Sequence, residues 1–361
     1  MFYSLIILIV LRSFEGAKKM VDRSTAKLPL EFADTHHHFL DTTRNDFQTF
    51  LGKLVPNESY LPEQYDRDVV ASLSAAGVTL VGSVHVEYMP DDGAKESAWI
   101  ESLSSSVKAI VGSCDLSSLT VDDDLMRLRE SSSRVRGVRW ILDCVGPFEP
   151  GTATHAGTIR HDGVDYLRGN NGGYDGEVVP SFERGFCLLE KHQLSFDLQC
   201  APAQLLQASK LFAKYPNIPV CINHLGKPRK LLGSDDSTST ELDEKELEIW
   251  RNGMNAMAEL PHVYVKISML GYAIPGWCRT PQRVDMMKQL VREVVDLFGA
   301  KRCMVGLNWW KDGACSDADG LSEVGPSPVA FMQHMSGFFE EYSQEDRQRL
   351  FVGTAREFYR F

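Results

Sequence analysis

Three consecutive histidines carry the clearest chemical signal in the sequence. His36, His37 and His38 stand at the end of a short apolar run that begins at Phe32, two residues after Asp34. If this run is a β-strand, His36 and His38 project from one face and His37 from the other. Two imidazoles on one face at the end of a strand can hold one metal ion or one substrate oxygen. A polar surface cluster is the alternative, but the chain has only 10 histidines, and three in a row favour the functional interpretation.

A second histidine occupies a comparable place. His224 follows the apolar run 219–223 and precedes a turn formed by Gly226 and Pro228. A lone histidine in such a place is commonly structural. At the carboxyl end of a strand, however, it would lie where barrel enzymes carry their active sites.

Two cations and three tryptophans lie in or beside apolar runs. Arg139 and Lys266 would be costly inside a barrel unless each meets an anion, so both are candidates to bind a carboxylate or a lactone oxygen of a substrate. For Arg139, an ion pair with Asp34 or Asp143 is the alternative. The tryptophans are Trp140, Trp309 and Trp310, which could form an apolar or sugar-stacking wall. For Trp140, a position in the core is the default.

The elements that must position these residues are read from the alternation of short β-rich runs with segments of helical period. This alternation is typical of β-α units around a parallel sheet. Eight β-rich runs are found, at residues 32–35, 78–84, 107–112, 135–142, 194–199, 219–223, 262–268 and 303–307. Eight strands without a glycine-rich phosphate turn after the first favour a closed (β/α)8 TIM barrel over an open doubly wound sheet.

Helices are expected between the strands. Apolar residues recur at three- and four-residue steps over 284–298 and over 205–212, and Pro62 and Gly77 are the expected limits of a further helix. Two polar insertions, at 146–180 and 229–244, are expected to be loops after the fourth and sixth strands, on the catalytic face. The chain is therefore expected to form a single barrel domain over residues 29–361.

Residues 1–28 are expected to be an N-terminal extension outside this domain. The apolar run 3–11 is far shorter than the ~20 residues that cross a bilayer. It lacks the preceding positive charge of a secretory signal, and Met20 is an alternative start. A targeting segment remains the alternative to the expected cytoplasmic location.

Charge and cysteine content exclude other classes of function. The chain has 361 residues and a formal net charge of −11, so binding to nucleic acid is not expected. Its 8 cysteines include no C-x-x-C pair and several lie in apolar runs, which argues for buried thiols rather than a zinc ribbon or a disulfide scaffold. The expected partner is a small-molecule substrate, and no organic cofactor is expected.

Taken in order along the chain, these motifs resemble the amidohydrolase superfamily, and in particular its amidohydrolase-2 branch of lactonases, similar to hydrolases of 2-pyrone-4,6-dicarboxylate and of sugar lactones. The resemblance covers about residues 30–361. It is carried by the motifs Asp34-x-His36-x-His38, Gly137-Val138-Arg139, residues 196–199, residues 224–228, Val265-Lys266-Ile267-Ser268 and residues 354–359. It implies a TIM barrel and a hydrolase that opens a small lactone, a cyclic ester of a sugar acid or a carboxylated pyrone, by attack of water. It further implies that His36, His38 and His224 hold a metal or the carbonyl oxygen.

One position departs from the family pattern. The resemblance implies an aspartate at the end of the eighth strand, where this chain has Asn308. A neutral amide accepts hydrogen bonds but has no useful basicity. Catalysis is therefore expected to be reduced or altered. Because three histidines and an amide bring no negative charge, one divalent metal, zinc or manganese, is expected to bind weakly or not at all.

Other bases are conceivable near the site. His85 and Glu87, which are also candidates to bind the substrate, would share one face of the second strand, and Asp312 follows Asn308 by four residues. A salt bridge is the alternative for Glu87, and a turn is the more ordinary role for Asp312. Two alternatives to a lactonase stay open: a catalytically inactive descendant that binds a related ligand, and a metal-dependent decarboxylase.

Overall fold

The computed structural model describes residues 27–54, 56–103, 105–144, 164–169, 176–228, 231, 241–309 and 326–361. Both polar insertions lie largely outside these residues, as does nearly all of the N-terminal extension. No helix in the described part of the chain is long and apolar enough to cross a bilayer.

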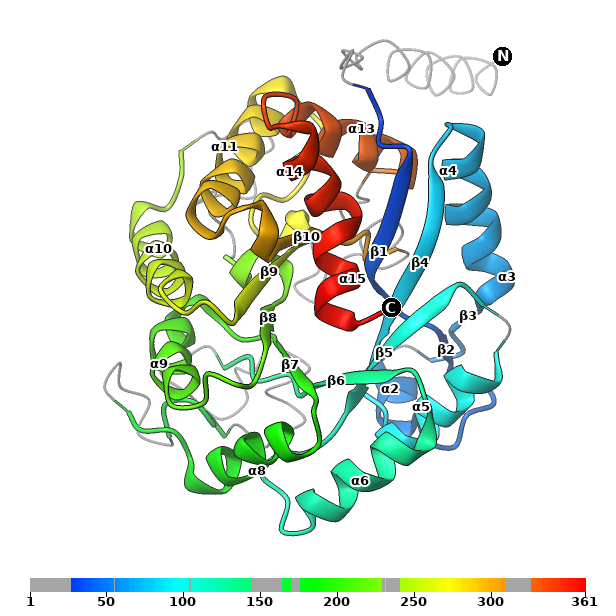
Figure 1. Cartoon of the computed structure of the whole chain (residues 1–361), viewed down its shortest axis with the longest axis vertical. Helices are drawn as coiled ribbons and strands as arrows, with labels where there is room; N and C mark the ends of the chain where they lie inside the picture. Colours follow the sequence, from blue (N-terminus) through cyan, green and yellow to red (C-terminus); the bar gives the residue numbers. More distant parts are fainter. Residues whose placement is uncertain are drawn as a thin grey trace, which may run out of the picture.

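Eight parallel strands form a nearly closed barrel (Figure 1). In order around the sheet they are β1 (Glu31–His37), β4 (Thr79–Val86), β5 (Val107–Ser113), β6 (Val135–Arg139), β7 (Ser195–Leu198), β8 (Val220–Ile222), β9 (Val263–Ile267) and β10 (Cys303–Val305). A parallel bridge between His37 and Trp309 joins the last strand segment to the first. The predicted TIM barrel is confirmed, and each predicted run overlaps one of these strands.

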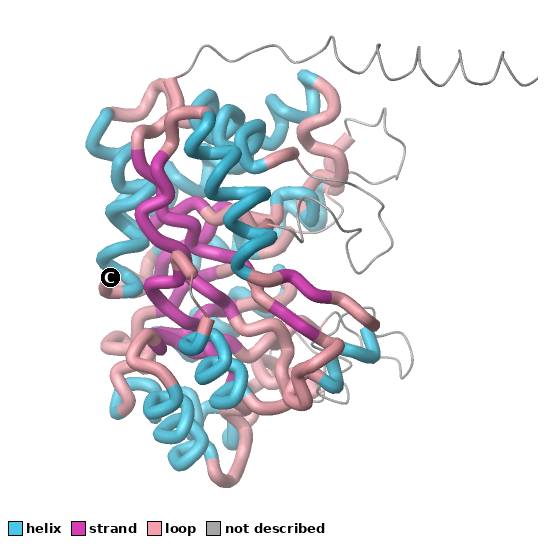
Figure 2. The backbone as a smooth tube through the Cα atoms, turned by 90° about the vertical axis from the view of Figure 1, so that its right-hand side faces the viewer, coloured by secondary structure: helices cyan, strands magenta, loops and turns pink. Residues whose placement is uncertain are grey.

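Helices surround the strands, as Figure 2 shows from the side. They are α2 (Thr49–Leu54), α3 (Pro62–Tyr65), α4 (Ala71–Ala75), α5 (Gly93–Ser102), α6 (Val121–Ser131), α8 (Pro180–Lys191), α9 (Pro202–Ala213), α10 (Glu244–Ala258), α11 (Pro281–Phe298), α13 (Pro328–Phe338), α14 (Gln344–Gln348) and α15 (Thr354–Tyr359). A short antiparallel pair, β2 (Leu40–Asp41) and β3 (Ser59–Tyr60), lies outside the barrel sheet.

The predicted helices are present, and their apolar stripes, first-turn prolines and terminal glycine lie where the sequence places them. The apolar stripe on α11 faces the core at Met287, Val291 and Val294. Proline opens α3, α9 and α11 at the first turn, where its missing N–H costs nothing. The helical segment from Pro62 ends before Gly77, which has a φ of 83°.

The inside of the barrel is filled separately from the layer between strands and helices. Small and apolar side chains from the strands meet the C-terminal helix α15, which lies across the barrel in Figure 1. This inner cluster comprises Ala33, Val84, Val86, Ala109, Val111, Cys221, Met304, Ala355, Phe358 and Tyr359. The seven cysteines described are all free thiols, and Cys315 lies outside the described residues.

Candidate active site

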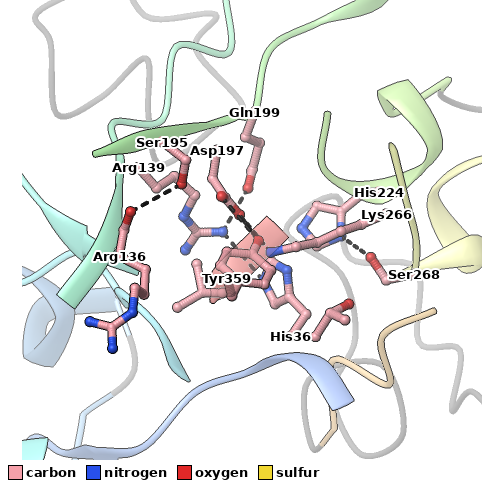
Figure 3. A network of polar contacts seen from close by, with 12 residues as sticks. His36, Arg136, Arg139, Ser195, Asp197, Gln199, His224, Lys266, Ser268 and Tyr359 are labelled. Atoms are coloured by element: carbon pink, nitrogen blue, oxygen red, sulfur yellow. Dashed lines mark hydrogen bonds and ion pairs between the residues drawn. The ribbon is translucent and has the colours of Figure 1, made fainter. Parts of the chain in front are cut away.

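Three imidazoles converge at the carboxyl ends of the strands. The ring centroid of His36 lies 5.0 Å from that of His38 and 4.6 Å from that of His224. All three side chains are buried, and the closeness of His36 and His224 is visible in Figure 3. We call this group the imidazole cup. The sequence-based expectation that these histidines meet agrees with their placement.

A β-bulge in β1 aims the first two of these rings. Asp34 pairs with Ser83 and His37 with His85, so three steps along β1 match two along β4. Such an extra residue redirects the side chains of a strand. His37 consequently faces outward, with its Nε2 3.0 Å from Ser83 Oγ and its ring 4.7 Å from that of Tyr65.

Asp34 also faces away from the cup. It accepts hydrogen bonds from the Tyr65 hydroxyl at 2.8 Å and from the backbone N–H of Leu307 at 2.8 Å. It thereby ties β1 to the segment that leads to Asn308. Burial raises the Asp34 pKa to about 6, against the lowering effect of these hydrogen bonds.

Strained backbone marks the ends of three neighbouring strands. His224, Met269 and Asn308 have φ values of 55°, 50° and 50°, in the left-handed region that ordinary residues avoid. Each follows its strand by two or three residues. Such conformations cost about 1 kcal/mol or more each and cluster at functional sites, where packing holds them in place.

Asn308 reaches the cup through its backbone. Its N–H donates to the His36 carbonyl at 2.7 Å, and its side-chain N–H donates to Met269 Sδ at 2.9 Å. The amide oxygen Oδ1 is buried and has no hydrogen-bond partner among the described residues. A buried acceptor without a partner is costly and suggests a ligand or water as its partner.

Arg139 joins the cup to a polar chain. Its Nη1 lies 3.5 Å from His36 Nε2 and 3.0 Å from Gln199 Oε1, and its Nε donates to Glu87 Oε1 at 2.7 Å. The anion that compensates Arg139 is therefore Glu87, and not Asp34 or Asp143, the partners considered in the alternative interpretation.

The same chain continues to a second ion pair. Gln199 Nε2 donates to Asp143 Oδ2 at 3.1 Å, and the same carboxylate oxygen lies 2.5 Å from Lys227 Nζ. Lys227 also lies 4.8 Å from the ring centroid of Tyr272. Asp143, Gln199 and Lys227 were not selected as site residues from the sequence, although Lys227 stands three residues after His224.

Lys266 lies within the barrel, with Tyr359 of α15 beside it. Its Nζ is 2.5 Å from Asp197 Oδ2, and the Tyr359 hydroxyl donates to the same carboxylate at 3.0 Å (Figure 3). Lys266 and Asp197 are completely buried. Lys266 thus has an internal partner. Burial is the main cause that lowers the pKa of His36 and His224, and the positive charge of Lys266 lowers both pKa values further.

The remaining candidates are placed differently. The expectation that His85 and Glu87 share one face is wrong, because β4 ends at Val86 and Glu87 turns toward Arg139. His85 lies outside the cup, where its Nε2 is 3.8 Å from Glu96 Oε2 and its ring lies beside that of His37. Trp309 is partly buried against the core, and Trp140 is a core residue, as its default predicted. Trp310 and Asp312 lie outside the described residues.

The hydrogen bonds of the cup fix two tautomers. His38 Nδ1 lies 2.7 Å from the Val86 carbonyl, which only accepts, so Nδ1 carries the hydrogen and Nε2 carries the lone pair. A guanidinium only donates, so His36 Nε2 accepts from Arg139. His224 Nδ1 is 3.0 Å from Ser268 Oγ, which orients that ring.

Burial keeps the imidazoles neutral. It lowers the pKa of His36, His38 and His224 well below the ordinary histidine value, and nearby cations lower each further, with Lys266 leading for His36 and Arg139 for His38 and His224. A neutral imidazole can accept a proton at pH 7. The cup therefore offers bases, and Arg139 offers a fixed donor.

The described residues of the cup do not fit a metal ion. No group of three or more His, Cys, Asp or Glu side chains in the described ranges is arranged to hold a metal ion. The Nε2 atom of His36 faces a guanidinium, and a cation there opposes the binding of a metal cation.

Comparisons with known proteins agree with the fold and the motifs. A sequence model of the amidohydrolase family matches residues 33–361. An L-fucono-1,5-lactonase of Burkholderia ambifaria is 24% identical over 331 residues, covering 88% of this chain and 96% of that protein. An uncharacterized protein of Sinorhizobium fredii is 26% identical over 344 residues, covering 91% of this chain and 97% of its own.

Solved structures show the same fold. An amidohydrolase from Burkholderia multivorans, solved with bound zinc, has a TM-score of 0.63 at 21% identity and covers 91% of this chain and 99% of its own. A putative 2-pyrone-4,6-dicarboxylic acid hydrolase from Pseudomonas putida has a TM-score of 0.59 at 17% identity. The match covers 92% of this chain and 98% of that chain. With a family match that spans nearly the whole described barrel, the chain belongs to the amidohydrolase family, the amidohydrolase-2 group that its motifs resemble.

Proposed function

We propose that this protein hydrolyses a small lactone at the imidazole cup. The observation that carries the proposal is the convergence of neutral His36, His38 and His224 with the guanidinium of Arg139 at the carboxyl ends of the barrel strands. The similarity to L-fucono-1,5-lactonases supports the same class of substrate.

Each step of ester hydrolysis has a candidate residue. Lactone opening needs a base for the attacking water, donors for the carbonyl oxygen and a proton for the departing alkoxide. His38 Nε2 takes a proton from water while the water oxygen attacks the carbonyl carbon. Arg139 stabilises the oxyanion. The ring C–O bond then breaks, and the protonated His38 returns its proton to the alkoxide, giving a hydroxy acid.

The charge balance of the site favours an uncharged lactone over a carboxylated one. Arg139, Lys227 and Lys266 each lie within 2.7 Å of a carboxylate oxygen, on Glu87, Asp143 and Asp197. Among the described residues of the site, every cation is thus already compensated by an anion. A substrate carboxylate would have to compete with these partners, whereas the hydroxyl groups of a sugar lactone can exchange hydrogen bonds with them.

A substrate panel tests this function. Purified protein, treated with chelator, is assayed for proton release with several aldono-1,5-lactones and with a carboxylated pyrone, with and without added zinc or manganese. We expect hydrolysis of uncharged lactones without added metal, and a loss of about 100-fold or more in kcat for His38→Gln, since a general base contributes that much. His192→Gln, a histidine paired with Asp122 outside the barrel, serves as the matched control and should retain activity.

Other outcomes identify the alternatives. Binding of lactones without turnover by the unmodified protein would support an inactive descendant. Release of carbon dioxide from an aromatic carboxylate only when metal is added would support a metal-dependent decarboxylase. Preference for the carboxylated pyrone would contradict the charge argument but not the lactonase proposal.

A further inference from the structure

Three arginines meet at the opposite end of the barrel from the imidazole cup. Arg136 stands near the start of β6, three residues before Arg139, and Figure 3 shows its side chain directed away from the histidines. Arg129 comes from the last turn of α6 and Arg360 from the end of α15. Together they line an open pocket of about 310 Å³, with Ser132, Ser133, Val135 and Gln193. We call it the arginine pocket.

None of the three guanidiniums forms an ion pair with a carboxylate in the part of the chain that the structure describes. They are held by backbone carbonyls instead. Arg129 donates to the His192 carbonyl, Arg136 to the Ser133 carbonyl at 2.7 Å, and Arg360 to the Gln193 carbonyl at 3.0 Å. Each guanidinium has five N–H donors, so this leaves donors available on each.

The carboxylates near the pocket are engaged elsewhere. In the adjoining groove that shares Arg360, Glu190 accepts from Asn217, and Glu357 accepts from Arg349. Glu101 accepts from Ser132 and from Arg134, whose Nε lies 3.0 Å away. Asp122 is paired with Lys191 and His192. None of these acidic residues lines the arginine pocket.

This arrangement is unexpected in a chain of net charge −11, which has acidic residues in excess. Three like charges in one pocket repel one another, and the charges of Arg136 and Arg129, after burial, lower the pKa of Arg360. The repulsion is relieved when an anion binds between them.

We propose that the arginine pocket is a binding site for a small phosphate-bearing anion, separate from the catalytic cup. The planar fork of arginine matches the oxygens of phosphate with two parallel hydrogen bonds, and the hydroxyl of Ser133 adds a further donor. The pocket volume exceeds that of a phosphate group, which leaves room for the organic part of a phosphate monoester.

Calorimetric titration tests the site. The full chain is titrated with inorganic phosphate and with glycerol phosphate at constant ionic strength, since salt screens exposed charges. We expect a Kd on the order of 1 mM or lower, and binding at least 10-fold weaker in the double variant Arg129→Gln/Arg360→Gln. Arg251→Gln removes an arginine that is paired with Glu293 on the surface, and this matched control should bind phosphate as the unmodified protein does.

The two ligands distinguish the source of the phosphate. Tighter binding of glycerol phosphate indicates a phosphate monoester, and equal binding indicates free phosphate. Two results would overturn the proposal: no binding of either ligand to the unmodified protein at about 20 mM ligand, or equal binding to the unmodified protein and the double variant. If the double variant does not fold, Arg136→Lys replaces it: loss of the guanidinium fork with the charge retained should weaken phosphate binding several-fold, and unchanged binding would overturn the proposal.

Discussion

At the scale of single residues, the cup is defined by what each imidazole nitrogen can do. The carbonyl of Val86 assigns the hydrogen of His38 to Nδ1, and Arg139 assigns a lone pair to His36 Nε2. The imidazoles of His36 and His38 are neutral because burial lowers their pKa values. These features supply a base and donors without the carboxylate that the family pattern places at position 308.

Asn308 is where this site departs most from that pattern. For Asn308→Asp, we expect kcat for lactone hydrolysis to rise about 10-fold or more with little change in KM, because a carboxylate adds basicity where the amide has none. Steady-state kinetics on the best lactone of the panel provides the measurement. Asn308→Ala, which removes the amide without adding a base, is the control and should show no rise.

A lower kcat in Asn308→Asp would show instead that the neutral amide has a positive role. Its unpartnered Oδ1 would then be a candidate acceptor for a substrate hydroxyl.

At the scale of elements, the C-terminal helix contributes a side chain to the interior of the barrel. α15 places Tyr359 against Asp197 and Lys266, next to the layer of residues that carries the cup. The charge of Lys266 is thereby held inside the barrel, where it helps to keep His36 and His224 neutral. The last helix therefore supports the electrostatics of a site whose residues come from other elements.

Removing the Tyr359 hydroxyl tests this support. We expect Tyr359→Phe to lower the free energy of unfolding by about 2 kcal/mol, since a buried hydrogen bond to an ion-paired carboxylate is lost. Urea unfolding followed by circular dichroism measures the change. Tyr342→Phe removes a similar bond, to Asp296 on the surface, and should cost less than about 0.5 kcal/mol. Equal effects of the two substitutions would contradict the role assigned to Tyr359.

At the scale of the whole molecule, buried ionisable groups couple stability to pH. Asp34 is the clearest case, because its pKa is raised from 3.8 to about 6. In this pH range the folded state binds more protons at Asp34 than the unfolded state. Its contribution to the free energy of unfolding is therefore largest below pH 3.8 and is lost as pH rises toward 6.

Asp34→Asn isolates this effect. The stability of the unmodified protein relative to the variant should fall by about 2 to 3 kcal/mol between pH 4 and pH 7, since each unit of pKa shift corresponds to about 1.4 kcal/mol. Urea unfolding at several pH values gives the difference. A difference that does not change with pH would contradict the raised pKa of Asp34.

Periodicity in the sequence determined much of the architecture. Eight β-rich runs and the helical stripes between them predicted the barrel, because alternation of apolar residues reports local backbone geometry. The residue types of His36, His38 and His224, placed after such runs, predicted their meeting at one edge, because carboxyl ends of parallel strands lie together. Strand limits were less accurate: β1 extends to His37 and β6 ends at Arg139.

Only the tertiary structure decided which charges meet. Glu87 and Arg139 are 52 residues apart, Asp197 and Lys266 are 69 apart, and Asp143 and Lys227 are 84 apart. No local periodicity encodes such pairs, since they depend on how the strands lie beside one another in the barrel. The same holds for the arginine pocket, whose members come from α6, β6 and the end of α15. Sequence thus determined which chemical groups stand at the ends of which strands, and folding determined which of them are neutralised and which remain to act.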